Sequence, residues 1–207
     1  MYARTTTVRG DPRAVDEGIA YCRNTVWPML QGMSGCVGMS MLAERDAGRC
    51  IVTAAWATEE AMRASAESVR DSRSKAAEML RADSVEVNEW EIAALHRLHA
   101  AGDSACARVV WAEVDPARMD SMIDAFKMSL VPRMEGADGF CSVSLLVNRN
   151  TGRCTWAATF ESREALEATR ERAGAGREEF GPATGTTFMD IAEMEVAIAH
   201  LRVPEMA

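Results

Sequence analysis

The chain has 207 residues, of which 48% are hydrophobic and 26% charged, and its net charge is −8. This composition is typical of a globular protein and excludes a disordered chain. The acidic balance disfavours nucleic acid as a partner, because the surface would repel phosphate groups. No apolar run approaches the ~18 residues that span a bilayer, and no secretory signal is visible. We therefore expect a cytoplasmic protein without a membrane partner.

The six cysteines form no zinc-binding pattern. They are Cys22, Cys36, Cys50, Cys106, Cys141 and Cys154. None belongs to a C-x-x-C motif or lies near a histidine at zinc-ligand spacing. We interpret them as small buried hydrophobic residues and expect neither a metal site nor a cofactor.

The sequence contains an internal repeat of two copies. Shifted by 104 residues, residues 4–98 match residues 108–202 without a gap, with 24 identities in 95 positions. Chance would give about 6% identity. The shared positions include Asp11-Pro12 with Asp115-Pro116, and Gly48-Arg49-Cys50 with Gly152-Arg153-Cys154. We therefore predict two modules, residues 1–98 and 107–207, joined by a linker at 99–106.

Each module begins with a strand (4–8 or 108–114) and a helix. Asp11 is the expected N-cap, followed by a proline at the first helical position. Apolar residues then recur at helical spacing, and a proline at 28 or 132 is expected to kink or end the helix. The apolar positions are Val15, Ile19, Cys22 and Val26 in module one, and Met119, Ile123, Phe126 and Leu130 in module two.

A hairpin follows, with strands at 36–44 and 49–57 in module one. The turn Arg45-Asp-Ala-Gly48 is typical of a hairpin and would place Met41 opposite Val52 and Val37 opposite Trp56. In module two the turn is Arg149-Asn-Thr-Gly152.

A second helix begins after Thr58 or Ser162, and a last strand covers 85–92 or 189–196. We expect this helix to run unbroken to Leu80 in module one. In module two, we expect glycines at 174 and 176 and the Gly181-Pro182 pair to break it early. The order β-α-β-β-α-β is that of a ferredoxin-like unit. The predicted fold class is therefore α+β, with two tandem ferredoxin-like modules forming an intramolecular pseudo-dimeric α/β barrel.

These residues resemble the antibiotic biosynthesis monooxygenase (ABM) family of the dimeric α/β-barrel superfamily. The resemblance rests on Pro28 with Gly35, the turn Asp46-Ala-Gly48, Trp56 at the end of the third strand, and Thr58-Glu-Glu-Ala-Met-Arg opening the second helix. Module two repeats it with Pro132, Gly139, Asn150-Thr-Gly152, Phe160 and Ser162. Members are usually homodimers of one module, so this chain would be a pseudo-dimer, and a higher oligomer stays open.

The resemblance implies a small hydrophobic or aromatic ligand between sheet and helices. It implies a cofactor-independent monooxygenase acting on an aromatic or polyketide-like substrate. The alternative is a non-catalytic ligand-binding or regulatory barrel. Haem-degrading members carry a histidine on the second helix and an asparagine on the first strand, and this sequence has neither. The expected ligand-binding residues are Trp56, Met39, Met41, Met62 and Arg4.

Several of these residues have an ordinary structural interpretation as well. Trp56 and the methionines suit a hydrophobic core, and Met-rich walls also suit poorly defined apolar ligands. Arg4 and Arg108 occupy equivalent positions, as do Glu89 and Glu193, so cross-sheet ion pairs are expected. An arginine could instead bind a phenolate or carboxylate. We expect module one to hold the better-formed cavity, with the aromatic residues of module two, Trp156 and Phe160 among them, filling its own.

Overall fold

The computed structural model describes residues 1–201, and the hydrogen-bonding order of its eight strands is closed. The order is β1-β3-β2-β8-β5-β7-β6-β4, with β4 returning to β1. The chain divides into two compact units. Unit 1 comprises Met1–Glu91 and the described chain from Met194, and unit 2 comprises Ile92–Glu193. The closed order and the two units confirm the predicted α+β barrel of two ferredoxin-like modules. The predicted boundaries at 1–98 and 107–207 describe the sequence repeat and stay a prediction.

Two long strands supply residues to both units. β4 (Ser84–Arg97) and β8 (Thr187–Leu201) extend well beyond the predicted strands. The first half of β4 pairs with β1 in unit 1, and the second half of β8 pairs with β2 there. The remaining halves lie in unit 2, beside β6 and β5. Each unit therefore contains the end of the last strand of the other sequence module: β4 ends in unit 2, and β8 ends in unit 1.

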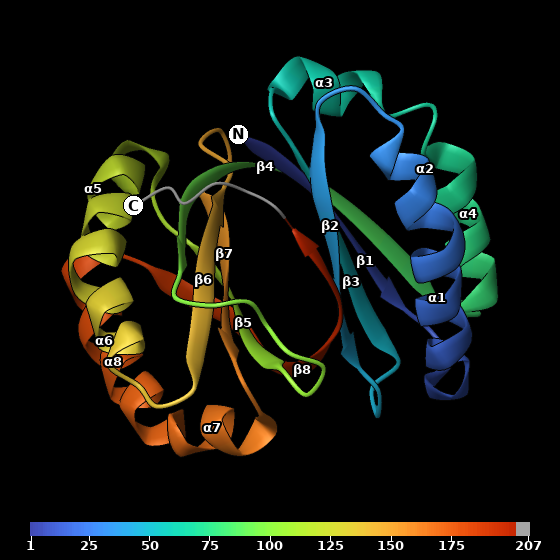
Figure 1. Ribbon diagram of the computed structural model, residues 1–207. Coiled ribbons are helices and arrows are strands. Elements are labelled where there is room, and N and C mark those ends of the chain that lie inside the picture. The colour runs from blue at the N-terminus through green and yellow to red at the C-terminus, as the bar shows by residue number, and fades with distance from the viewer. Residues whose placement is uncertain (202–207) are drawn as a thin grey trace. The chain divides into compact units, whose positions relative to one another are not determined.

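In unit 1, helices cover one face of the sheet (Figure 1). The strands are β1 (Tyr2–Arg9), β2 (Cys36–Glu44) and β3 (Arg49–Trp56), and the helices are α1 (Val15–Tyr21), α2 (Trp27–Gln31), α3 (Glu59–Ala64) and α4 (Arg70–Met79). The predicted apolar face of the first helix is buried against Met39, Met41 and Trp56. Asp11 accepts the predicted capping hydrogen bond, from the backbone N–H of Arg13 at 2.9 Å.

Unit 2 has the same arrangement. Its strands are β5 (Cys106–Glu113), β6 (Phe140–Val147) and β7 (Arg153–Phe160), and its helices are α5 (Met119–Ala125), α6 (Val131–Glu135), α7 (Arg163–Ala168) and α8 (Arg170–Thr184). The predicted face of its first helix packs on the sheet with Trp156 and Phe160.

The prolines at 28 and 132 do not end the first helix. One π-helical turn precedes each, at Cys22–Val26 and Phe126–Leu130, and the helix then continues. The Trp27 N–H bonds to the Cys22 carbonyl, and Pro28, which has no N–H, follows it. The wider turn lets the helix continue although the proline has no N–H to donate. Such π-helical turns occur frequently at functional sites.

The hairpin register is confirmed at its turn and differs at its open end. Met41 lies opposite Val52 as predicted, and Gly48 adopts φ +60, where an added Cβ would lie 2.1 Å from the Gly10 carbonyl oxygen. Only glycine fits that close approach. The prediction for Val37 is wrong, because a β-bulge brings Cys36 opposite Trp56.

The predictions for the second helix are wrong in both modules. In unit 1 the helix is interrupted between α3 and α4, because the Ser65 hydroxyl donates to the Met62 carbonyl and accepts from Arg4. In unit 2, α8 continues past Gly174 and Pro182 to Thr184. Phe180 on that helix is buried against Trp156, so tertiary packing outweighs the glycine cost of about 1 kcal/mol each.

Candidate functional site

Unit 1 contains a cavity between its helices and its sheet. The space between its walls, counted together with the open solvent at its mouth, is about 630 Å³. Strands β1 and β3, the π-helical turn and α4 supply the walls. The lining residues are Arg4, Thr6, Val8, Cys22, Val26, Leu30, Val52, Ala54, Trp56, Val69, Ser72, Arg73, Ala76 and Leu80.

Unit 2 contains a cavity of the same size at the equivalent place. Counted in the same way, its space is also about 630 Å³. Its lining residues are Arg108, Val110, Leu130, Arg133, Met134, Ala137, Trp156, Ala158, Phe160, Thr169, Arg172, Ala173, Gly176 and Arg177. The expectation that aromatic residues fill this cavity is therefore wrong.

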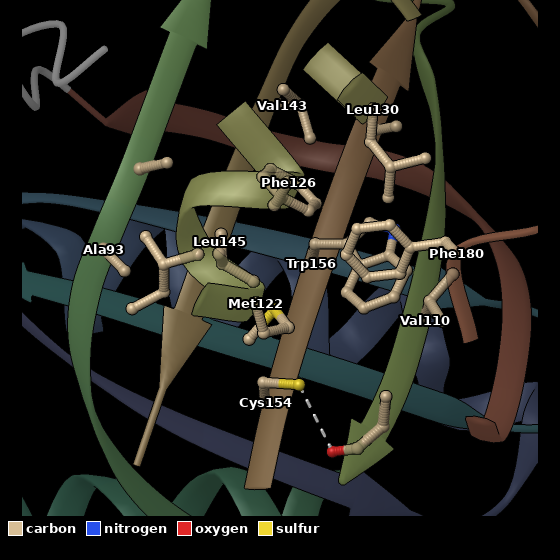
Figure 2. Packing of buried hydrophobic residues seen from close by; sticks show 14 of the residues in the cluster. Ala93, Val110, Met122, Phe126, Leu130, Val143, Leu145, Cys154, Trp156 and Phe180 are labelled. Carbon is tan, nitrogen blue, oxygen red and sulfur yellow. Dashed lines mark hydrogen bonds between the residues drawn. The ribbon is translucent and has the colours of Figure 1, made fainter. Parts of the chain in front are cut away.

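Two aromatic residues of unit 2, Trp156 and Phe160, line the cavity, and three others pack against Trp156 outside its lining. Trp156 makes edge-on contacts with Phe126, Phe180 and Phe188, at ring-centroid distances of 5.6, 6.4 and 5.9 Å. Figure 2 shows Trp156 beside Phe180, with Leu130 nearby. Because these rings pack on one another, Trp156 is held at the wall.

Arg4 is a buried anchor at the floor of the unit 1 cavity. Its guanidinium donates to Glu89 at 2.6 and 3.0 Å, to the Ser65 hydroxyl at 2.8 Å and to the Met62 carbonyl at 2.7 Å. The predicted ion pair with Glu89 is confirmed. All four hydrogen bonds go to protein atoms, so Arg4 keeps little capacity to bind a ligand.

Arg108 is anchored in the same way in unit 2. It donates to Glu193 at 2.7 and 3.2 Å, to the Thr169 hydroxyl at 2.8 Å and to the Leu166 carbonyl at 3.0 Å. Glu193 also accepts from Arg170, and hydrogen bonds from Arg170 first and Arg108 second lower the pKa of its carboxyl. In both modules, therefore, the buried arginine donates to a hydroxyl and a carbonyl at the point where the second helix is interrupted.

The guanidinium of a second arginine in each cavity forms no hydrogen bond or ion pair with the described residues. Arg73 on α4 and Arg177 on α8 line the two cavities and are half-buried. Burial, and then the charges of Arg4 and Arg108 respectively, lower the pKa of each guanidinium, and the more distant charges of Glu89, and of Glu178 and Glu193, oppose this shift. A desolvated cation without an ion-pair partner is costly unless an anion joins it.

The sequence predictions did not include these two arginines. Arg73 and Arg177 are identical residues 104 positions apart, so the repeat carried the signal. Charged residues on a helix usually face solvent. Only their position in a cavity lining distinguishes Arg73 and Arg177 from the other arginines of these helices.

Trp56 forms part of the unit 1 cavity wall and is 1% exposed. Its indole Nε1 is buried and has no hydrogen-bond partner. An unsatisfied buried donor costs about 1–3 kcal/mol, so it is unusual in a folded protein. The equivalent residue of unit 2 is Phe160, which has no such donor.

The three methionines expected to bind ligand lie elsewhere. Met39, Met41 and Met62 are fully buried in the core cluster of unit 1 and are absent from the cavity lining. The structure thus brings Trp56 and Arg4 together at the cavity and places the methionines in the surrounding core.

Neither cavity is lined by a carboxylate or a histidine. His96 stacks on Phe140 and His200 on Trp27, away from the lining residues. The Cys22 thiol lines the unit 1 cavity, but burial raises its pKa to about 12, so it is protonated at neutral pH. Among residues 1–200 no cluster of His, Cys, Asp and Glu could hold a metal ion, and no described helix is long and apolar enough to cross a membrane.

Comparisons with known proteins agree with this architecture. The model of the family "Antibiotic biosynthesis monooxygenase" matches residues 1–77. The chain belongs to the ABM family. The uncharacterized protein Rv2557 of Mycobacterium tuberculosis is 46% identical over 206 residues, which are 100% of this chain and 92% of that protein. The uncharacterized protein Rv2558 of the same organism is 45% identical over 207 residues, which are 100% of this chain and 87% of that protein.

A solved structure shows the fold of the whole ABM chain. The crystal structure of an anthrone oxidase-like protein has a TM-score of 0.67 and 14% identity. The match covers 94% of this chain and 90% of that one. At this identity the likeness concerns the fold alone, which extends over both modules.

Proposed function

We propose that this ABM protein is a cofactor-independent monooxygenase for a small aromatic or polyketide-like substrate bound in the unit 1 cavity. One observation carries the proposal: an apolar cavity with an aromatic wall, Trp56, holds a cation, Arg73, whose guanidinium forms no hydrogen bond or ion pair with a described residue. An electron-rich aromatic anion, such as a phenolate, would complement both features.

The proposed reaction uses the substrate as its own reductant. A bound phenolate donates electrons to O2, and the protein supplies orientation and a stabilised anion. Arg73 would stabilise the phenolate, which lowers the pKa of the substrate hydroxyl. Since no carboxylate or histidine lines the cavity, we expect the pH dependence to follow the titration of the substrate. Trp56 would form a wall against the ring, and Arg4 would hold the floor in place.

Oxidation of the anthrone dithranol tests the proposal. Two C–H bonds of its methylene group break and a C=O bond forms. One atom of O2 enters the carbonyl and the other leaves as water with the two hydrogens. Formation of the anthraquinone is followed by absorbance, O2 uptake with an electrode, and the origin of the new oxygen by labelled O2. We expect turnover above the rate in buffer.

Two arginine variants give that test a matched control. Arg73→Met should lower kcat/KM by roughly 10- to 100-fold, the usual effect of losing one charge-stabilising donor. It should also move the rise of activity with pH to higher pH, because the substrate loses its stabilising cation. Arg63→Met, on α3 outside the cavity lining, should behave as wild type. Anthraquinone formation no faster than in buffer would contradict the proposal.

The second candidate function is a non-catalytic binding or regulatory barrel. The absence of any acid or base among the lining residues of unit 1 favours it, because a binder needs none. Anthrone binding without oxidation would support this candidate. Cytoplasmic location and any assembly beyond one chain stay predictions.

A further inference from the structure

The cavity of unit 2 is lined by more arginines than that of unit 1. Four arginines line it, Arg108, Arg133, Arg172 and Arg177, and no acidic residue does. The unit 1 cavity has two arginines. This concentration of positive charge occurs in a chain whose net charge is −8. A cleft lined by one sign of charge raises the local concentration of ligands of the opposite sign.

Two of these four guanidinium groups are already neutralised within unit 2. Arg108 pairs with Glu193 at 2.7 Å, and Arg133 pairs with Glu179 at 2.6 Å. Arg172 and Arg177 have no hydrogen bond or ion pair among the described residues. Arg177 is half-buried and Arg172 exposed, so one cation lies inside the cavity wall and one at its mouth.

The rest of the unit 2 cavity is apolar and partly aromatic. Trp156 and Phe160 supply rings, and Val110, Leu130 and Met134 supply aliphatic surface. A ligand that satisfies both parts has a flat apolar body and an anionic group at one end. A free phosphate or a simple inorganic anion would leave the apolar walls without a partner.

The two modules differ at the positions that create this charge. At the repeat positions of Arg133 and Arg172, unit 1 has Met29 and Ser68. The inner arginine, by contrast, is shared as Arg73 and Arg177. The additional charge at the mouth therefore belongs to unit 2 alone.

We propose that the cavity of unit 2 is a second binding site, for an aromatic ligand carrying a carboxylate or sulfonate, with Arg177 as the inner anion-binding residue and Arg172 at the mouth. The site is separate from the oxygenase site proposed in unit 1. Its test measures binding, so it succeeds or fails independently of turnover.

A matched pair of probes separates charge from hydrophobic contact. Anilinonaphthalene sulfonate and phenylnaphthylamine share the same aromatic body, and only the first carries an anionic group. Titration calorimetry with the full chain should show tighter binding of the sulfonate. Arg177→Met should weaken sulfonate binding at one site by roughly 10- to 100-fold, as expected for a lost charge-assisted hydrogen bond.

The Arg177→Met variant also separates the two explanations by the direction of the change in affinity, which would be opposite if binding were purely hydrophobic. Methionine makes the wall more apolar, so binding driven by contact area alone would tighten for both probes. The double variant Arg133→Met with Arg172→Ser gives the unit 2 mouth the residues of unit 1. It should weaken the sulfonate several-fold and leave phenylnaphthylamine unchanged. Because both positions are exposed, this variant should fold as wild type.

The control is Arg163→Met, an exposed arginine on α7 outside the cavity lining. It should bind both probes as wild type does. Equal affinity of the wild type for the two probes would overturn the proposal. So would sulfonate binding in the Arg177 and double variants that matches the Arg163 control.

Discussion

Replacement of Trp56 by phenylalanine isolates the effect of one buried N–H group. The indole Nε1 is buried without a partner, and unit 2 already has a phenylalanine at the equivalent position. The substitution removes two carbon atoms of packing, which costs about 1.6 kcal/mol at ~0.8 kcal/mol each. It also removes an unsatisfied donor, which returns about 1–3 kcal/mol. We expect the free energy of unfolding to stay within about 1 kcal/mol of wild type.

Alanine at the same position gives the reference. Trp56→Ala removes the whole ring from a site that is 1% exposed, and such changes cost about 3–5 kcal/mol. Urea unfolding followed by circular dichroism measures both variants, and thermal unfolding should show a shift of about 2–4 °C per kcal/mol. If the phenylalanine variant loses 3 kcal/mol or more, the N–H contributes an interaction in the folded state, and the reasoning from an unsatisfied donor fails.

Three further predictions concern buried charge and thiols. Arg108→Met should lower the free energy of unfolding, measured by urea unfolding, by about 1–3 kcal/mol. This loss is smaller than the loss expected when a buried charge is left without any partner, because Glu193 still accepts hydrogen bonds from Arg170. Glu193 has a lowered pKa when folded, so its stabilisation is present above its ordinary pKa and is lost as pH falls through the folded value. Glu193→Gln should therefore destabilise at pH 7 and differ less from wild type at pH 3, and a larger gap at pH 3 would refute this sign. Burial raises the pKa of the Cys22 thiol to about 12, so at pH 8 a thiol reagent should label Cys36, the half-buried cysteine, before Cys22, as peptide mapping would show.

Local patterns in the sequence predicted the fold because each pattern has a local physical cause. The caps at Asp11 and Thr58 depend on a side chain and the next few N–H groups, and both form. The turn at Gly48 depends on one residue with positive φ. The same local causes occur in both modules, so the order of the elements and the hairpin register near the turn follow from them.

The errors arose where distant contacts outweigh local preference. Ser65 ends a helix because it hydrogen-bonds to Arg4, which is 61 positions earlier in the chain. Gly174 does not end one, because Phe180 further along the helix is held by packing. The role of Arg73 was equally invisible, since burial beside a cavity is a property of the assembled unit.

Covalent duplication gives the two cavities freedom that a homodimer lacks. In a homodimer of one module, any substitution changes both sites at once. Here the inner arginine is retained at 73 and 177, while the wall changes from Trp56 to Phe160 and the mouth gains Arg172. What is shared is the arginine proposed to bind an anion and its anchored neighbour, and what differs is the surface around them. The geometry therefore favours one mode of anion recognition in two cavities whose surrounding surfaces differ.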